Sequence, residues 1–170
     1  SIQLQAVLEV FRRSKGKRIA LFLDACESGM LADLSQRGIF SVMNDQELTD
    51  FFADSEFYAC FSACKSDESS YPYGAKKHGI WTFHLLQALR GNAKLAMEGG
   101  LVTSTSLQNY LAREIPKTIR TVRTDLAAQT PWACGSMSKE FVVADLRPIL
   151  AARQAARLGS AKKMTQATLK

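Results

Sequence analysis

Residues 18–29 read RIALFLDACESG, and this stretch decides how the rest of the chain is interpreted. From Arg18 to Asp24 the chain has a short apolar run, which is typical of a parallel strand buried on both faces. Residues 57–63 form a second run of the same kind. Because helix-like segments separate the strand-like ones, the pattern predicts an α/β fold with a mostly parallel sheet that helices cover on both sides.

Periodicity and turn residues predict the remaining elements. Helices are expected at 2–14, 44–53, 79–91, 104–122 and 147–158, with Pro116 interrupting the fourth, and a third strand at 141–144. Loops are expected at 30–43, 65–77 and 129–135. In a parallel sheet, functional groups gather at the carboxyl ends of the strands. The residues that follow the first two strands are therefore the first place to look for chemistry.

The length and composition indicate an ordinary globular protein. The 170 residues suit one domain with a short appendage, and 46% hydrophobic and 22% charged residues are near the average for such chains. No apolar run approaches the roughly 18–20 residues that a membrane-spanning helix needs, and the first residues do not resemble a signal peptide. A cytoplasmic protein without a membrane partner is therefore expected.

The net charge of +6 is concentrated at one end of the chain. Every acidic residue lies within 1–146, where lysine and arginine balance them, whereas 147–170 holds six cations and no acid. The sequence thus divides into a neutral body, 1–146, and a basic helical tail or linker, 147–170. Such a tail could contact nucleic acid or anionic lipid, but a solvated helix is the favoured interpretation, and a nucleic-acid partner is not expected.

The chain has four cysteines: Cys26, Cys60, Cys64 and Cys134. None is in a C-x-x-C pair and only two histidines are present, so no zinc site is expected, and a reducing cytosolic setting is the default. Cys60 lies within the second strand and suits a buried structural role. Cys26 differs, because it follows a strand in a small, polar, glycine-containing turn. Its thiol should be exposed there, and its backbone N–H could stabilise an oxyanion.

Several segments together resemble the caspase-like cysteine peptidases, most closely the bacterial and metacaspase branch. They are LFLDACESG at 21–29, FYACFSACKSDES at 57–69, HGIWTFHLLQAL at 78–89, QTPWACG at 129–135 and KEFVVADL at 139–146. The resemblance covers about 1–146 and implies a caspase-hemoglobinase-like three-layer α/β/α sandwich. It also implies that this chain holds only the carboxyl-terminal part of the peptidase domain, so the sandwich is incomplete in it.

The resemblance implies a catalytic mechanism as well. Cys26 would be the nucleophile of an endopeptidase and would form a thioester acyl-enzyme with the substrate. A histidine must generate its thiolate, because an unperturbed thiol is mostly protonated at neutral pH. In the family this histidine precedes the cysteine in a His-Gly turn, whereas His78 and His84 both follow Cys26. The expected base therefore belongs to an amino-terminal segment of the same protein that is absent from this chain.

The acidic residues near Cys26 suggest which substrates are cleaved. In the metacaspase-like branch an aspartate at the position of Asp24 receives arginine or lysine. Asp67 and Glu68 add further negative charge after the second strand. An acidic pocket pairs with a basic side chain, so cleavage after Arg or Lys is expected. The alternative is that Asp24 caps its turn while Asp67 and Glu68 are solvated loop charges.

The resemblance suggests three secondary features. Asp33 matches a calcium ligand of some metacaspases, but a calcium site needs six to eight oxygen ligands, so calcium is only a weak candidate and no cofactor is required. Arg37, before Gly38, is the natural basic site for self-processing between the two strands. Trp132 could line a substrate subsite or be a packed core residue.

Two other functions remain open at this point. One is a catalytically inactive, caspase-like interaction module, because the chain lacks the expected histidine. The other is a CHAT-type cysteine peptidase with the same fold and a partner-gated specificity. A redox role for Cys60 and Cys64 is the least favoured, because a four-residue spacing along a strand separates them by about 13 Å.

Overall fold

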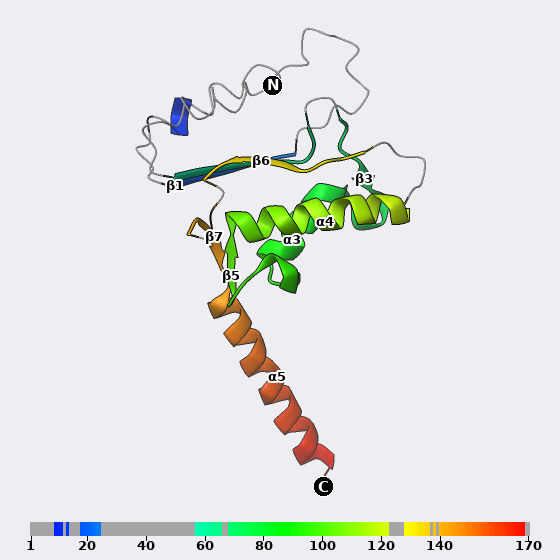
Figure 1. The fold of residues 1–170 in the computed structure, drawn as a ribbon. Helices are drawn as coiled ribbons and strands as arrows, with labels where there is room; N and C mark the ends of the chain where they lie inside the picture. The colour runs from blue at the N-terminus through cyan, green and yellow to red at the C-terminus, as the bar shows by residue number, and fades with distance from the viewer. Residues whose placement is uncertain are drawn as a thin grey trace.

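The computed structural model of residues 1–170 describes 9–11, 13, 18–24, 57–65, 68–122, 128–136, 138 and 140–168 (Figure 1). Asp24 and Glu68 therefore belong to the described part of the chain. Cys26, Asp33, Arg37 and Asp67 lie outside it, as do the loop expected at 30–43 and the helix expected at 44–53.

The central sheet has three strands in the order β1-β2-β6. β1 is Arg18–Leu23 and β2 is Phe57–Ser62, which confirms the two strands predicted there. They pair in parallel, with Arg18 opposite Phe57 at one end and Leu23 opposite Ser62 at the other. Their carboxyl ends therefore meet at one edge of the sheet, which is where the functional groups were expected.

The third strand, β6, corrects the prediction of a loop at 129–135. Residues Trp132–Gly135 pair with β2 in the antiparallel direction. Trp132 and Cys134 pack on one face of the sheet and Ala133 on the other, so the strand has the usual period of two. Pro131 before it and Gly135 within it look like loop residues in the sequence. Proline is nevertheless tolerated next to a strand that needs no N–H from it.

Gly135 is in the left-handed region, with φ of +101°, a conformation that favours glycine. It lies opposite Ala59 of β2. A Cβ at position 135 would lie 2.8 Å from the ring of Tyr58 and closer still to the Tyr58 carbonyl oxygen. Glycine is therefore required where β6 approaches the start of β2.

The expectation of a mostly parallel sheet is wrong for the described strands. β1 and β2 are the parallel pair, whereas β2 and β6 are antiparallel. The strand predicted at 141–144 is confirmed as β7, Val142–Asp145, but it pairs antiparallel with β5, Leu101–Thr103, in a separate sheet. Mixed sheets in which an antiparallel strand lies beside parallel ones are common in α/β folds.

A polar loop was expected at 65–77, and its described residues before Pro72 are irregular. It contains one strand of a short antiparallel hairpin, β3 (Pro72–Tyr73), which pairs with β4 (His78–Gly79). A 3-10 turn, η2 (Gly74–Lys76), connects the two strands, and a second one, η3 (Lys94–Ala96), follows later in the chain. The hairpin leads directly into the next helix.

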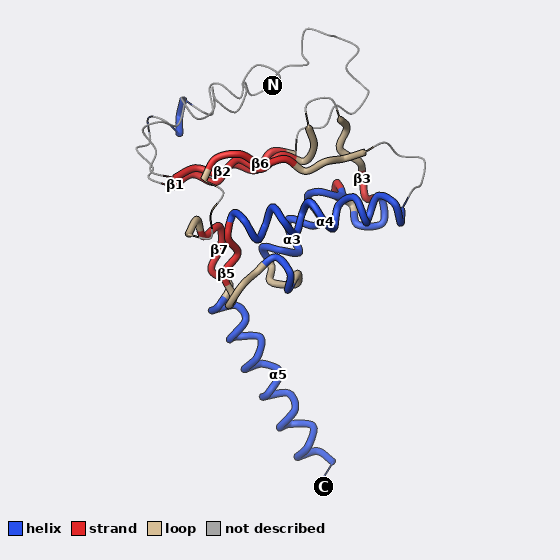
Figure 2. Tube along the Cα trace, viewed as in Figure 1, coloured by secondary structure: helices blue, strands red, loops and turns tan. Residues whose placement is uncertain are grey.

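Two helices cover one face of the central sheet (Figure 2). They are α3, Ile80–Leu89, and α4, Ser104–Val122. Both helices were predicted, but α4 continues through Pro116, where the sequence predicted an interruption. A spacing of four residues places the apolar side chains of α4 on one stripe, formed by Leu107, Leu111, Ile115 and Ile119. The stripe and the buried residues of α3 pack with Ala59, Phe61 and Ala63 of the sheet. Each large apolar side chain buried there contributes about 2 kcal/mol to stability.

The opposite face of the sheet carries its own apolar cluster, made of Ile19, Leu21, Tyr58, Cys60 and Cys134. Phe11, from a helical segment at 9–11, packs against this cluster. The described residues therefore place helix on both faces of a sheet, in agreement with the α/β class.

The last helix, α5, spans Arg147–Thr168 and extends beyond the end predicted near 158. Leu150 packs against the body, and the Arg153 guanidinium donates to the Asn92 side-chain oxygen at 3.2 Å. Every residue from 151 to 161 is exposed, and the helix points away from the body (Figure 1). Among the described residues, no helix combines the length and the apolar character needed to cross a membrane.

Candidate active site

The candidate site lies at the carboxyl ends of β1 and β2. The Ala63 N–H donates to the Leu23 carbonyl at 3.0 Å. The segments that continue from β1 and β2 therefore still lie side by side one residue beyond the paired strands. Asp24 is the first residue after β1. Three other segments reach the same edge: 68–71, the start of α3, and 128–131.

Two hydroxyl groups hold the Asp24 carboxylate. Ser70 donates from its hydroxyl to Oδ1 at 3.2 Å, and the Thr82 hydroxyl donates to Oδ2. The Asp24 side chain remains exposed to solvent. Asp24 thus connects the end of β1 to two segments that follow β2, about 46 and 58 residues further along the chain. These contacts place the carboxylate across the strand ends, although the turn that follows Asp24 lies outside the described residues.

The first turn of α3 lies against the same carboxylate. Gly79 is the N-cap of this helix, and a Cβ there would lie 3.2 Å from Asp24 Oδ2. Glycine therefore lets the carboxylate approach the helix start closely. The Asp24 carboxylate therefore lies at the amino-terminal end of α3, which carries partial positive charge.

Gln129 supports this arrangement from the interior. Its side chain is only 1% exposed, and its Oε1 accepts from the Tyr71 N–H at 3.1 Å. Its Nε2 donates to the Ala63 carbonyl at 3.1 Å and to the Ser70 hydroxyl at 3.4 Å. Gln129 therefore connects the segment before β6 to the end of β2 and to the serine that reaches Asp24.

Glu68 was predicted to bind substrate. In the structure its carboxylate accepts hydrogen bonds from the loop that precedes β6. Thr130 donates to it twice, from its backbone N–H and, at 2.8 Å, from its hydroxyl. The backbone of Glu68 also accepts from the Cys64 thiol at 3.3 Å. In these contacts Glu68 joins the loop after β2 to the loop before β6, so a structural role is established and the substrate-binding role stays a prediction.

The two histidines have different surroundings. His84 is 6% exposed between α3 and α4, with Nδ1 3.0 Å from the Tyr110 hydroxyl and Nε2 2.7 Å from the Thr118 hydroxyl. Burial lowers the pKa of His84, and the charge of Glu114 opposes this in part. Burial also raises the pKa of Tyr110 to about 12. His78 is exposed in β4, next to Gly79.

The remaining predicted residues are placed as follows. Trp132 is half-buried and packs on the apolar cluster of the sheet face that Phe11 covers, which agrees with the packed alternative. Cys60 is fully buried in β2 and lies opposite Cys134 of β6, in keeping with a structural role. Within the described residues, no group of three or more potential ligands could hold a metal ion.

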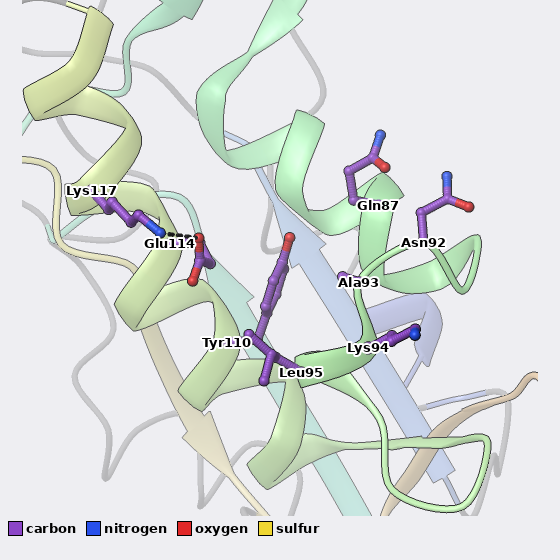
Figure 3. Close-up of a pocket in the computed structure, with 8 residues that line it drawn as sticks. All are labelled: Gln87, Asn92, Ala93, Lys94, Leu95, Tyr110, Glu114 and Lys117. Atoms are coloured by element: carbon purple, nitrogen blue, oxygen red, sulfur yellow. Dashed lines mark ion pairs between the residues drawn. The ribbon is translucent and has the colours of Figure 1, made fainter.

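A separate open groove of about 590 Å³ lies beside Tyr110 of α4 (Figure 3). Its lining comprises Gln87, Asn92, Ala93, Lys94, Leu95, Tyr110, Glu114 and Lys117. Lys117 and Glu114, which are three residues apart on α4, form an ion pair at 3.8 Å on one wall of the groove. Neither Asp24 nor Glu68, the predicted substrate-binding residues that the structure describes, lines this groove, so the strand ends remain the candidate site.

Sequence reasoning did not single out Ser70 or Thr82, and it placed Gln129 and Thr130 in a loop at the rim of the site without giving either a role. One sequence feature could have pointed to them. Each is a polar residue in a segment that borders a strand end or begins a helix. Their convergence depends on contacts between segments far apart in the sequence. No family model, curated protein or solved structure matches the chain.

Proposed function

We propose that the chain is part of a caspase-like cysteine endopeptidase that cleaves after Arg or Lys, with Cys26 as its nucleophile. The observation that carries the proposal is the Asp24 carboxylate, which is exposed at the end of β1 and held by two hydroxyl donors. Cys26 follows it by two residues. A fixed acid at the carboxyl ends of parallel strands, two residues before a cysteine in the sequence, is suited to binding a basic side chain.

The fold supports this proposal in a general way. β1 and β2 are parallel, helices α3 and α4 cover one face of their sheet, and Phe11 packs on the other. We extend this arrangement to a three-layer sandwich of the caspase-hemoglobinase type, completed by a segment outside residues 1–170.

In the proposed reaction, the Cys26 thiol gives its proton to a histidine, and the thiolate attacks the carbonyl carbon of the scissile peptide bond. The imidazolium then returns the proton to the leaving amine, and water hydrolyses the remaining thioester. The Cys26 backbone N–H stabilises the oxyanion. His84 is poorly suited as the base because both ring nitrogens already have partners inside the protein. We assign the base to an amino-terminal segment of the same protein, as the resemblance to the caspase-like peptidases implies.

The proposed specificity rests on charge. Asp24 is the main acceptor for an arginine or lysine side chain, and Asp67 adds a second negative charge. Glu68 acts through its hold on Thr130, which keeps the two loops that border the site together. An acidic substrate side chain would meet uncompensated like charge and be rejected.

The test is the variant Cys26→Ala in the full-length polypeptide, assayed on reporter peptides ending in Arg or Lys. Removing a covalent nucleophile should lower kcat by more than about a thousandfold. Cys134→Ala is the matched control, because it removes a buried thiol of β6 that the mechanism does not use. Cleavage that persists in Cys26→Ala at the level of the control would contradict the proposal.

A non-catalytic interaction module is the second candidate, and the internal hydrogen bonds of His84 favour it. An affinity label that places a chloromethyl ketone after an arginine residue separates the two candidates. Stoichiometric alkylation of Cys26 in the intact protein indicates an activated thiolate and a peptidase. Labelling no faster than that of a free thiol indicates the inactive module.

A further inference from the structure

We propose that Thr82 and Ser70 are positioning residues, which hold the Asp24 carboxylate in the orientation that receives a cationic substrate side chain. This inference rests on the proposed function, and it adds the groups that determine the specificity. Neither hydroxyl is proposed to touch the reacting atoms.

The first argument is the division of acceptor positions on Asp24. A carboxylate has about four positions that accept hydrogen bonds. One oxygen accepts from Ser70 and the other from Thr82. About two positions therefore remain on an exposed side chain, and they suit a guanidinium or ammonium group, which donates and does not accept.

The second argument concerns the chemistry of the partners. Among the described residues, hydroxyl groups hold Asp24, and no lysine or arginine forms an ion pair with it. A neutral donor orients a carboxylate without cancelling its charge, so the full negative charge remains for the substrate. An orientation set before binding also removes the entropy cost of ordering the side chain during binding.

The third argument is that the two hydroxyls are themselves fixed. Ser70 is 5% exposed and lies 3.4 Å from the donating Gln129 amide. Thr82 is in the first turn of α3, whose N-cap, Gly79, leaves just enough room for the Asp24 carboxylate. The position of the acid is thus determined by two separate segments as well as by its own strand.

The experiment compares kcat and KM for two matched peptides, one with arginine before the scissile bond and one with citrulline. Citrulline has nearly the same shape but no charge, so the ratio of the two kcat/KM values measures recognition of the cation. In the full-length protein, Thr82→Val should lower this ratio roughly tenfold, the cost of one hydrogen bond to a charged group. The loss should fall on KM for the arginine peptide and not on its kcat.

Three further variants sharpen the result. Thr82→Ser restores a hydroxyl and should return the ratio to within about twofold of the wild type. Ser70→Ala should also lower the ratio, and Asp24→Asn should bring it close to one. Thr121→Val is the control, because this α4 hydroxyl donates to the Lys117 carbonyl and contacts nothing at the site. Its ratio should equal that of the wild type.

Each outcome decides between the two proposals. A Thr82→Val variant that keeps the wild-type ratio, or that slows both peptides equally, would overturn the positioning role while Cys26-dependent cleavage still supports the peptidase. A wild-type protein that cleaves neither peptide in a Cys26-dependent manner would overturn the proposed function itself, and the positioning role with it. Thermal unfolding of every variant separates a loss of fold from a loss of recognition.

Discussion

Two clusters of polar side chains in this protein resemble each other in composition and differ in burial. In the Asp24 cluster, hydroxyls of Ser70 and Thr82 hold a carboxylate. In the His84 cluster, hydroxyls of Tyr110 and Thr118 hold an imidazole. The Asp24 side chain is exposed, whereas His84 is 6% exposed between two helices.

The difference shows what makes a titratable group available for chemistry. Both ring nitrogens of His84 are occupied, so the ring connects α3 to α4 and has no free position for a substrate. Asp24 uses part of its accepting capacity for the protein and keeps the rest toward solvent. A polar network therefore stabilises the fold when all its hydrogen-bonding positions are used within the protein. It offers a binding group when one exposed member keeps positions that can accept further hydrogen bonds.

The largest effect on stability is expected from the buried support of the Asp24 cluster. Gln129→Leu keeps the volume but leaves the Tyr71 N–H and the Ala63 carbonyl without this partner. Since an unsatisfied buried group costs about 1–3 kcal/mol, the free energy of unfolding should fall by about 3 kcal/mol. Urea denaturation measures it. Gln154→Leu, at an exposed position of α5, is the control and should change it by less than about 0.5 kcal/mol. Equal effects of the two variants would show that the Gln129 contacts contribute nothing.

A slightly smaller loss is expected in the His84 cluster. His84→Phe retains a ring but leaves the hydroxyls of Tyr110 and Thr118 without their partner. The free energy of unfolding at pH 7.5 should fall by about 2 kcal/mol. His78→Phe, at an exposed position, should lie within about 0.5 kcal/mol of the wild type. A His84→Phe protein as stable as this control would mean that the closed network adds nothing to the fold.

The same histidine predicts how stability depends on pH. Burial lowers the pKa of His84 in the folded protein, so below the unfolded value of 6.5 the unfolded chain binds a proton that the folded protein does not. The contribution of neutral His84 to the free energy of unfolding is therefore complete above pH 6.5. It is lost as the pH decreases toward the lower pKa of the folded protein. Denaturation curves between pH 8 and 5 should show this loss in the wild type. The His84→Phe variant should lack this component. If the free energy of unfolding depends on pH in the same way in both proteins, His84 does not cause this loss of stability.

The smallest effect is expected at Glu68. Glu68→Gln removes the charge and one of the two carboxylate oxygens that accept from Thr130, so the free energy of unfolding should fall by about 1 kcal/mol. Glu140→Gln, on an exposed side chain, is the matched control and should have no measurable effect. If Glu68 also receives substrate, Glu68→Gln will raise KM for an arginine peptide more than for a citrulline peptide. If it acts as a loop contact, both peptides will change equally.

The sequence predicted the elements with the strongest patterns. The continuous apolar runs predicted β1 and β2, and the apolar stripe predicted the helix α4, which continues past Pro116 although an interruption was expected there. Proline inside a helix usually ends or bends it, but apolar packing on both sides of this position, at Ile115 and Ile119, outweighs the local cost.

Other parts could not be predicted because they depend on contacts between distant segments. β6 is four residues long and ends in glycine, so its strand character comes from pairing with β2 and not from its composition. The sequence singled out Asp24, but its partners Ser70 and Thr82 become visible only when three segments meet in space. The partner of the Glu68 carboxylate, Thr130, belongs to a segment that the sequence presented as a loop.

The left-handed glycine at the end of β6 has a consequence for how this protein can evolve. Gly135 fits β6 against Tyr58, and the strand it ends begins directly after the segment that contains Gln129 and Thr130. Any side chain at position 135 would push this edge strand outward and pull both residues away from Ser70 and Glu68. A saturation library at position 135 should therefore return glycine alone among active clones, although the residue lies at the far end of β6 from the segment that borders the site.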